Sequence, residues 1–471
     1  MNGYLDMELL RFTTAGSVDD GKSTLIGRLL YDSKSIFEDQ MEAVRAASER
    51  LGNEAVNLAL LTDGLRAERE QGITIDVAYR YFATPKRKFI IADTPGHIEY
   101  TRNMVTGAST ADAAIILVDA RNGIIEQTRR HSCIAALLQL PHVIVAVNKM
   151  DLVHFDRDVF LRIRGAYAAM AARLHLQHVH CLPISALEGD NVVTPSTRMA
   201  WYEGAPLLSL LETLPLRETL DDRPARFPVQ YVIRPQTAAF HDYRACAGRI
   251  ASGTYRVGDA VTVLPSGTQS TITAIDEADR PLHEASSPRS VAIRLADSVD
   301  VGRGDMIVKS SELPLVGAHI RLTVCWLHHR PLSVGARYIV RHATDELFGI
   351  VRDVHYKVNM NTLENVAGEK TVRMNDIASI ELKTSRPLKY DFYRRNRITG
   401  SLVLIDESTF ETVGAGMIAE QPDASDLGTN FSDLGTETSD LGTETSDLGL
   451  ETSDLGLETS DPGLGTSDSF D

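Results

Sequence analysis

The sequence of 471 residues lacks the features that mark secreted, membrane-bound or disulfide-stapled proteins. Its four cysteines lie far apart and form no Cys-x-x-Cys pair, which argues against a zinc site and a disulfide framework. The longest apolar runs, such as residues 113–118, fall far short of the roughly 20 residues that span a bilayer. The first twelve residues contain Asp6 and Glu8 and lack the basic and apolar regions of a secretory signal. We therefore expect a cytoplasmic protein without a membrane segment.

An excess of positive charge is also missing. The chain has 48 basic and 64 acidic residues, a formal net charge of −16, and 13 of the acidic residues lie in residues 421–471, where Lys and Arg are absent. The first 420 residues therefore carry 48 basic against 51 acidic residues and are close to neutral. Hydrophobic residues make up 43% of the chain, near the average of soluble globular proteins, and its length predicts about three domains.

The hydrophobic pattern changes at about residue 222. Before it, short apolar runs alternate with segments of 3.6-residue periodicity, which predicts an α/β domain with a parallel sheet and crossover helices. After it, short alternating runs punctuated by glycine predict two antiparallel β-barrels. The apolar runs of the first region are residues 12–15, 89–92, 114–118, 143–147 and 179–184. We predict domains at residues 1–222, 223–313 and 314–420.

Residues 421–471 form a low-complexity acidic segment that repeats every seven residues, as in Ser-Asp-Leu-Gly-Thr-Glu-Thr. Each repeat offers one regular leucine and contains a glycine, whereas a coiled coil needs two apolar positions per heptad. We therefore predict a disordered tail without a packed core.

A glycine-rich loop, Gly-Ser-Val-Asp-Asp-Gly-Lys-Ser at residues 16–23, follows the first predicted strand and opens the helical run at residues 25–31. In such a loop the backbone N–H groups and the helix N-terminus bind phosphate oxygens, Lys22 reaches the β and γ phosphates, and Ser23 binds Mg²⁺. The predicted phosphate-binding residues are Gly16, Ser17, Val18, Asp19, Asp20, Gly21, Lys22, Ser23, Thr24 and, from the next motif, Gly96.

The second motif is Asp-Thr-Pro-Gly-His at residues 93–97, which ends the predicted strand at residues 89–92. Asp93 is placed to hold Mg²⁺ through water, and the amide of Gly96 is placed to sense the γ phosphate. Between the two motifs, Thr74 offers a hydroxyl to Mg²⁺, so its segment is a candidate for an order–disorder switch. The imidazole of His97, next to Gly96, is suited to orienting the attacking water.

The third motif, Asn-Lys-Met-Asp at residues 148–151, selects the base. A carboxylate at Asp151 accepts from the ring N–H and the exocyclic amine of guanine, a pair of donors that adenine lacks, so the motif favours GTP over ATP. Asn148 reaches the opposite edge of the base, and Ala186 offers a backbone donor. The predicted guanine-binding residues are Asn148, Lys149, Asp151, Ser185 and Ala186.

These motifs resemble the translation-factor branch of GTPases over about residues 8–420. Elongation factor Tu usually has histidines at the positions of Ser17 and Asp20. The stretches GSVDDGKSTLIGRLLYDS, DGLRAEREQGITIDVAYRYF and ADTPGH followed by YTRNMVTGAS are instead similar to the large GTPase subunit of bacterial ATP sulfurylase, also called sulfate adenylyltransferase subunit 1.

The resemblance implies that GTP hydrolysis, with Mg²⁺, drives the formation of adenosine 5′-phosphosulfate and pyrophosphate from ATP and sulfate. It also implies that a separate small catalytic subunit, in a heterodimer or higher assembly, carries out the adenylyl transfer. The sequence agrees, since it contains no SGGxD-type pyrophosphate loop. By the same resemblance, His97 positions the attacking water.

Two other functions remain open. The first is an elongation-factor-like carrier of aminoacyl-tRNA, but residues 223–420 contain 25 basic against 22 acidic residues, less positive charge than an RNA-binding surface needs. We therefore do not expect a nucleic-acid partner, although one basic cluster gathers Arg386, Lys389, Arg394, Arg395 and Arg397. The second is a regulatory GTPase without a coupled reaction, which acts as a nucleotide-dependent docking module.

Overall fold

The structure, a computed structural model, describes residues 7–34, the single positions 42, 44, 48 and 58, and residues 76–97, 101–216, 220–235, 243–278 and 280–420. The chain divides into two compact units, Met1–Leu434 and Gly435–Asp471, and all described residues belong to the first. The predicted disordered tail lies outside the described residues. Among the described helices, none combines the length and apolar character that crossing a membrane requires.

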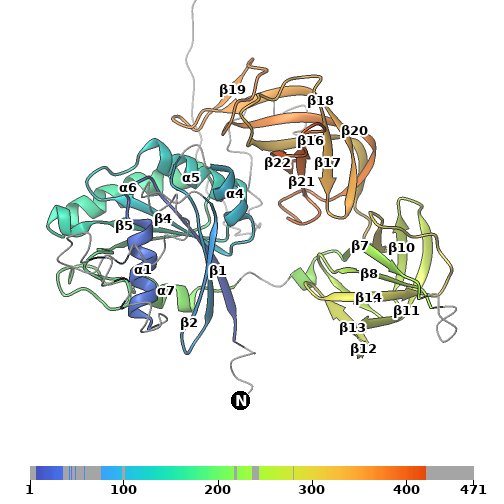
Figure 1. The fold of residues 1–471 in the computed structure, drawn as a ribbon, viewed down its shortest axis with the longest axis horizontal. Coiled ribbons are helices and arrows are strands. Elements are labelled where there is room, and N and C mark those ends of the chain that lie inside the picture. Colours follow the sequence, from blue (N-terminus) through green and yellow to red (C-terminus); the bar gives the residue numbers. More distant parts are fainter. Residues whose placement is uncertain are drawn as a thin grey trace, which may run out of the picture. The chain divides into compact units, whose positions relative to one another are not determined.

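The first domain contains one six-stranded sheet with the strand order β2-β3-β1-β4-β5-β6 (Figure 1). Its strands are β1 (Leu9–Ala15), β2 (Ala78–Ala83), β3 (Lys88–Asp93), β4 (Ala113–Asp119), β5 (His142–Asn148) and β6 (His178–Pro183). The five strands that the sequence predicted are β1, β3, β4, β5 and β6, and they pair in parallel. The α/β prediction is thus confirmed.

The sequence pattern did not reveal β2, which pairs antiparallel with β3 at one edge, so the sheet is mixed rather than purely parallel. An edge strand needs no continuous apolar run because one side of it faces solvent. In β2 the side chains of Tyr79 and Tyr81 are 46% and 70% exposed, whereas Phe82 is buried.

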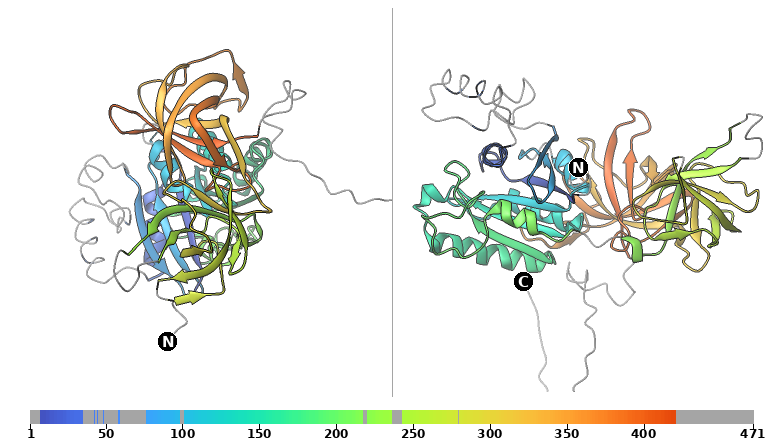
Figure 2. Two further views of the ribbon diagram at one scale, coloured as in Figure 1. Left: turned by 90° about the vertical axis from the view of Figure 1, so that its right-hand side faces the viewer. Right: turned by 90° about the horizontal axis from the view of Figure 1, so that it is seen from below.

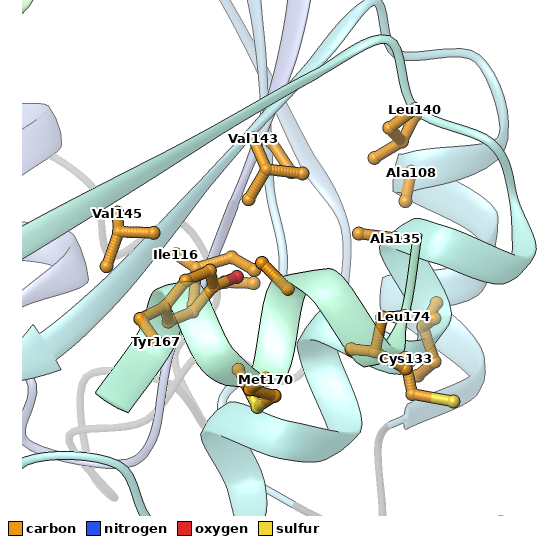
Figure 3. Packing of buried hydrophobic residues seen from close by; sticks show 14 of the residues in the cluster. Ala108, Ile116, Cys133, Ala135, Leu140, Val143, Val145, Tyr167, Met170 and Leu174 are labelled. Atoms are coloured by element: carbon orange, nitrogen blue, oxygen red, sulfur yellow. The ribbon is translucent and has the colours of Figure 1, made fainter. Parts of the chain in front are cut away.

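Helices cover both faces of this sheet. Buried residues of α1 (Lys22–Asp32) and α7 (Leu207–Thr213) pack with Phe12, Ile115 and Ile144 in one hydrophobic cluster. The opposite face packs against α4 (Thr101–Ser109), α5 (Glu126–Leu137) and α6 (Arg157–Arg173). Figure 3 shows Tyr167 of α6 close to Ile116 of the sheet. In the part of the chain that the structure describes, η3 (Met150–Val153) and η4 (Leu220–Asp222) are short 3-10 helices.

The second domain is a closed antiparallel barrel. Its strands are ordered β10-β15-β7-β8-β14-β11, and β10 pairs with β11 to close the ring. Figure 2 shows this domain in green and yellow from two further sides. The strands are β7 (Arg226–Ile233), β8 (Ala245–Arg249), β9 (Thr254–Arg256), β10 (Ala260–Leu264), β11 (Thr268–Glu277), β12 (Arg280–Leu282), β13 (Glu284–Ser286), β14 (Ser290–Leu295) and β15 (Met306–Lys309).

The third domain is also a closed antiparallel barrel, in which β17 pairs with both β21 and β18. Its strands are β16 (Leu315–Trp326), β17 (Arg337–His342), β18 (Asp345–Val358), β19 (Asn365–Ala367), β20 (Ile377–Tyr390), β21 (Ser401–Ile405) and β22 (Thr412–Ile418). The prediction of two antiparallel barrels is confirmed. The domain boundaries at 222/223 and 313/314 stay predictions; they fall between η4 and β7 and between β15 and β16.

Candidate nucleotide-binding site

The predicted nucleotide motifs follow the carboxyl ends of strands in the first sheet. The glycine-rich loop follows β1, the Asp93 motif ends β3, the Asn148 motif ends β5, and Ser185 comes just after β6. Because these strands run parallel, their carboxyl ends meet at one edge of the sheet. Ligands of open α/β sheets bind at that edge.

The phosphate loop is shaped around the side chain of Lys22. This lysine is 7% exposed, and its Nζ donates hydrogen bonds to the carbonyl oxygens of Gly16 at 2.9 Å and Ser17 at 2.8 Å. Burial lowers the pKa of Lys22, although the nearby carboxylates of Asp93, Asp20 and Asp19 raise it. The ammonium group is thus held inside the loop by hydrogen bonds to two neutral backbone oxygens.

Helix α1 begins at Lys22 after Gly21, which has a left-handed φ of 91°. No side chain caps this helix start, so its amide groups are available to an anion. A side chain at Gly21 is excluded by space as well as by φ, since a Cβ would lie 2.5 Å from Nδ2 of Asn148. Ser23 and Thr24 are half-buried, whereas Val18 and Asp19 of the loop are exposed.

The guanine motif and the phosphate loop are joined through Asn148. Its Nδ2 donates to the carbonyl oxygen of Asp20 at 2.7 Å, and its Oδ1 accepts from the amide of Ala186 at 2.9 Å. The hydroxyl of Ser185 donates to Oδ1 of Asp151 at 2.6 Å. Asn148 and Ala186 are therefore linked by hydrogen bonds to the phosphate loop, and Ser185 and Asp151 are hydrogen-bonded to each other.

The fifth predicted residue, Lys149, has a left-handed φ of 62°, and its Nζ lies 3.0 Å from Oδ2 of Asp119 at the end of β4. No sequence motif had predicted a role for Asp119. Burial raises its pKa, but hydrogen bonds from Arg121 and Lys149 outweigh burial and lower the pKa to about 2. Its place at the end of an apolar run, as at Asp93, was the signal that could have identified it.

The Asp93 motif lies against the phosphate loop. Asp93 is 1% exposed, and its Oδ1 accepts from the hydroxyl of Thr14 at 3.1 Å. A Cβ on Gly96 would lie 2.6 Å from the backbone carbonyl oxygen of Gly16, so only glycine allows this approach. His97, the next residue, is exposed. Thr74, the other predicted switch residue, lies outside the described residues.

Gln127 of α5 is a further contact of this motif that sequence reasoning missed. It is 5% exposed, and its Nε2 donates to the carbonyl oxygen of Gly96 at 3.2 Å. The same amide lies 3.0 Å from Nε2 of His131, which is fully buried. The contact between Gln127 and Gly96 depends on how α5 packs against the sheet, so no local sequence pattern predicts it.

The oxygen atoms at this edge have the chemistry that Mg²⁺ prefers. Mg²⁺ is usually bound by one or two protein oxygen ligands together with phosphate and water, and Ser23 and Asp93 supply a hydroxyl and a carboxylate. A dedicated cage is not expected for it, and the described residues contain no group of three or more His, Cys, Asp or Glu side chains suited to a metal ion.

Comparison with known proteins places the chain in a family. The elongation factor Tu GTP binding domain matches residues 7–223, and the GTP-eEF1A C-terminal domain-like family matches residues 319–419. The chain thus has a GTP-binding domain of the elongation factor Tu type. The structure of Sup35 complexed with GDP aligns with a TM-score of 0.40 and 22% identity over 88% of this chain and 95% of that chain, which is too distant for a functional inference.

Curated relatives are much more similar in sequence. The bifunctional enzyme CysN/CysC of Mycobacterium tuberculosis is 53% identical over 88% of this chain and 68% of its own length. Sulfate adenylyltransferase subunit 1 of Laribacter hongkongensis is 53% identical over 88% of this chain and 86% of its own length. The same subunit of Aeromonas hydrophila is 51% identical over 88% and 86%. This chain therefore belongs to the sulfate adenylyltransferase subunit 1 family, within the translation-factor GTPases.

Proposed function

We propose that this chain is the GTPase subunit of a sulfate adenylyltransferase. In this function, GTP hydrolysis drives the formation of adenosine 5′-phosphosulfate and pyrophosphate from ATP and sulfate, and a partner catalytic subunit carries out the adenylyl transfer. Membership of the subunit 1 family supports the proposal. The observation that carries it is the hydrogen-bonded group of Asp20, Asn148 and Ala186, which joins a base-reading loop to a phosphate loop.

Guanine recognition is assigned to Asp151. Its carboxylate is oriented by the hydroxyl of Ser185, 2.6 Å away, and it accepts the two N–H groups of the guanine edge. Asn148 and the amide of Ala186 define the other side of the base. Because the acceptor would face no matching donors on adenine, ATP is rejected at this site.

Phosphate binding is assigned to the loop of residues 16–24 together with Gly96. Lys22 supplies a buried positive charge, and the uncapped start of α1 supplies amide donors. The amide of Gly96 binds the γ phosphate and so distinguishes GTP from GDP.

Hydrolysis is assigned to His97 and to residues that would hold Mg²⁺, namely Ser23, Asp93 and Thr74. When bound, Mg²⁺ supplies positive charge that neutralises the phosphate oxygens. His97 orients the attacking water, for which its exposed position directly after Gly96 is suitable. The hydrogen bond from the hydroxyl of Thr14 fixes the orientation of the Asp93 carboxylate.

A carrier of aminoacyl-tRNA is the less favoured function. The basic cluster in residues 386–397 does not form one free surface, because Lys389 is 1% exposed and lies 3.0 Å from Oδ2 of Asp345. Arg386 also donates to the carboxylate of Asp345, and Arg397 donates to the hydroxyl of Tyr393. Two of the five basic residues thus share the negative charge of one carboxylate.

The test is adenosine 5′-phosphosulfate synthesis by this chain mixed with a small sulfate adenylyltransferase subunit. We expect GTP to increase product formation, and GDP or a non-hydrolysable GTP analogue not to sustain the increase. Sulfate and ATP should in turn accelerate GTP turnover. The proposal would be excluded if product formation were equal with and without GTP, or if the rate of GTP hydrolysis did not change when sulfate was added. Either result would favour a docking GTPase. Retention of aminoacyl-tRNA in a GTP-dependent filter assay would favour the carrier instead.

A further inference from the structure

Asp20 is a carboxylate buried inside the phosphate loop. Its side chain is held by the loop itself, since Oδ2 accepts from the amide of Ser17 at 2.6 Å. Its carbonyl oxygen is held from the other side by Asn148 at 2.7 Å. Only 3% of the surface of Asp20 is exposed.

The carboxylate and the phosphate-binding lysine contact the same short piece of backbone. Asp20 bonds to the amide of Ser17, while Lys22 donates to the carbonyl oxygens of Gly16 and Ser17. A Cβ on Gly16 would lie 3.2 Å from Oδ2 of Asp20. The negative charge is therefore built into the loop that would receive the phosphates of a nucleotide. Two like charges in a partly buried site repel each other more strongly than they do in water.

We propose that the Asp20 carboxylate weakens guanine nucleotide binding by repelling the phosphates, while its bond to Ser17 keeps the loop in shape, so that Asp20 sets the rate of GDP release. The proposal rests on the proposed function, because a subunit that drives a reaction must release GDP in every cycle. Differences in affinity between related complexes are expressed mostly in the dissociation rate. A repulsive charge inside the loop shortens the residence time without an added exchange factor.

The charged groups around Asp20 come from three other elements. Lys22 begins α1, Asp119 ends β4, and Lys149 follows β5. Burial raises the pKa of Asp20; Asp119 raises it further, whereas the bond to Ser17 and the charges of Lys22 and Lys149 lower it. A bound polyphosphate adds negative charge and raises this pKa again, so binding takes up protons. The affinity for GDP is therefore expected to increase as the pH falls.

The experiment compares the full chain with its Asp20→Asn variant. Asparagine keeps a side-chain oxygen that can accept from Ser17 but carries no charge. We expect Asp20→Asn to slow the release of fluorescently labelled GDP by about tenfold or more and to lower its Kd by the same factor, the effect of removing one nearby charge. The Kd of guanosine, which has no phosphate, should stay within about twofold. A matched control is Glu203→Gln, which removes one exposed negative charge from the same domain and should leave GDP release unchanged.

Two further measurements test the role of the Asp20 charge. Asp20→Ala removes both the charge and the bond to Ser17, so it should release GDP faster than Asp20→Asn. As the pH falls, GDP affinity should increase less in Asp20→Asn than in wild type, because asparagine takes up no proton. The phosphates titrate equally in both proteins, so the difference between them reports Asp20. Faster or unchanged GDP release in Asp20→Asn, with guanosine still bound, would overturn the proposal. These assays contain neither sulfate nor partner, so their failure is distinct from failure of the proposed function.

Discussion

The nucleotide site and the third domain both bury charged side chains, but they pair them in opposite ways. Lys22, 7% exposed, donates to two backbone carbonyl oxygens. Lys389, 1% exposed, lies 3.0 Å from the carboxylate of Asp345, which also accepts from Arg386. The hydrogen bonds of Lys22 go to neutral acceptors although carboxylates lie nearby, whereas Lys389 forms an ion pair with the Asp345 carboxylate. Burial of a charge therefore does not identify a binding site; the kind of partner does.

The largest expected effect is on stability and lies in the third domain. Asp345→Ala leaves Lys389 buried without its carboxylate, which should cost about 3–5 kcal/mol of unfolding free energy. GTP affinity at the nucleotide site should not change. Denaturant unfolding and GTP titration measure the two quantities.

The matched control for this prediction is Glu346→Ala. Glu346 pairs with Arg341, but the two side chains are 53% and 59% exposed, so the loss should stay below about 1 kcal/mol. If Asp345→Ala were no more destabilising than this control, the contrast between the two regions would fail.

The next effect concerns base selection at the nucleotide site. Asp151→Asn turns an acceptor of guanine N–H groups into a donor, so GTP affinity should fall by about 10²-fold or more, and xanthosine triphosphate should bind better than it does to wild type. Equilibrium binding of GTP and of xanthosine triphosphate measures this change in base preference. Unchanged GTP affinity would remove Asp151 from base recognition.

A smaller effect should appear in the acid stability of the nucleotide domain. Burial, with the nearby positive charges of Lys22 and Arg130, lowers the pKa of His131 from 6.5 to about 3. Below pH 6.5 the unfolded chain binds a proton that the folded chain does not, so stability falls as the pH falls toward 3.

At pH 5 this loss is about 2 kcal/mol relative to pH 7. His131→Asn, which does not titrate, should lose less stability over the same interval when urea unfolding is followed at both pH values. Parallel losses in the two proteins would show that His131 is not kept neutral by the fold.

The smallest effect is expected for the acidic repeat. Because the repeat has no apolar periodicity with which to pack, ending the chain after Glu420 should leave thermal stability and GTPase rate nearly unchanged. Differential scanning calorimetry and phosphate release are the measurements. A large decrease in either would mean that residues 421–471 stabilise the body of the protein or take part in hydrolysis.

The nucleotide motifs were predictable because each consists of consecutive residues just after an apolar run. The alignment of strand ends at one sheet edge then brings Asp20, Asn148 and Ala186 together, as the spacing implied. Gln127 was missed because its contact with Gly96 depends on tertiary packing, whereas Asp119 ends an apolar run and carried a sequence signal that was not used.

Edges and ion pairs were the least predictable features of the fold. The edge strand β2 has exposed tyrosines in place of a buried run, so apolar periodicity does not detect it. Lys389 looked like part of a basic surface because its partner, Asp345, is 44 residues away in the sequence.

The central claim is that GTP hydrolysis at this site drives sulfate activation. The most direct measurement is the final yield of adenosine 5′-phosphosulfate per GTP consumed, with the partner subunit, ATP and sulfate present, for wild type and His97→Ala. Formation of the phosphate–sulfate anhydride is unfavourable, so the yield can exceed the level set by ATP, sulfate and pyrophosphate only if hydrolysis is coupled to it.

We expect wild type to exceed that level and His97→Ala to bind GTP normally, hydrolyse it about 10²-fold more slowly and remain at that level. A wild-type yield that stays at the GTP-free level while GTP is consumed would contradict the account.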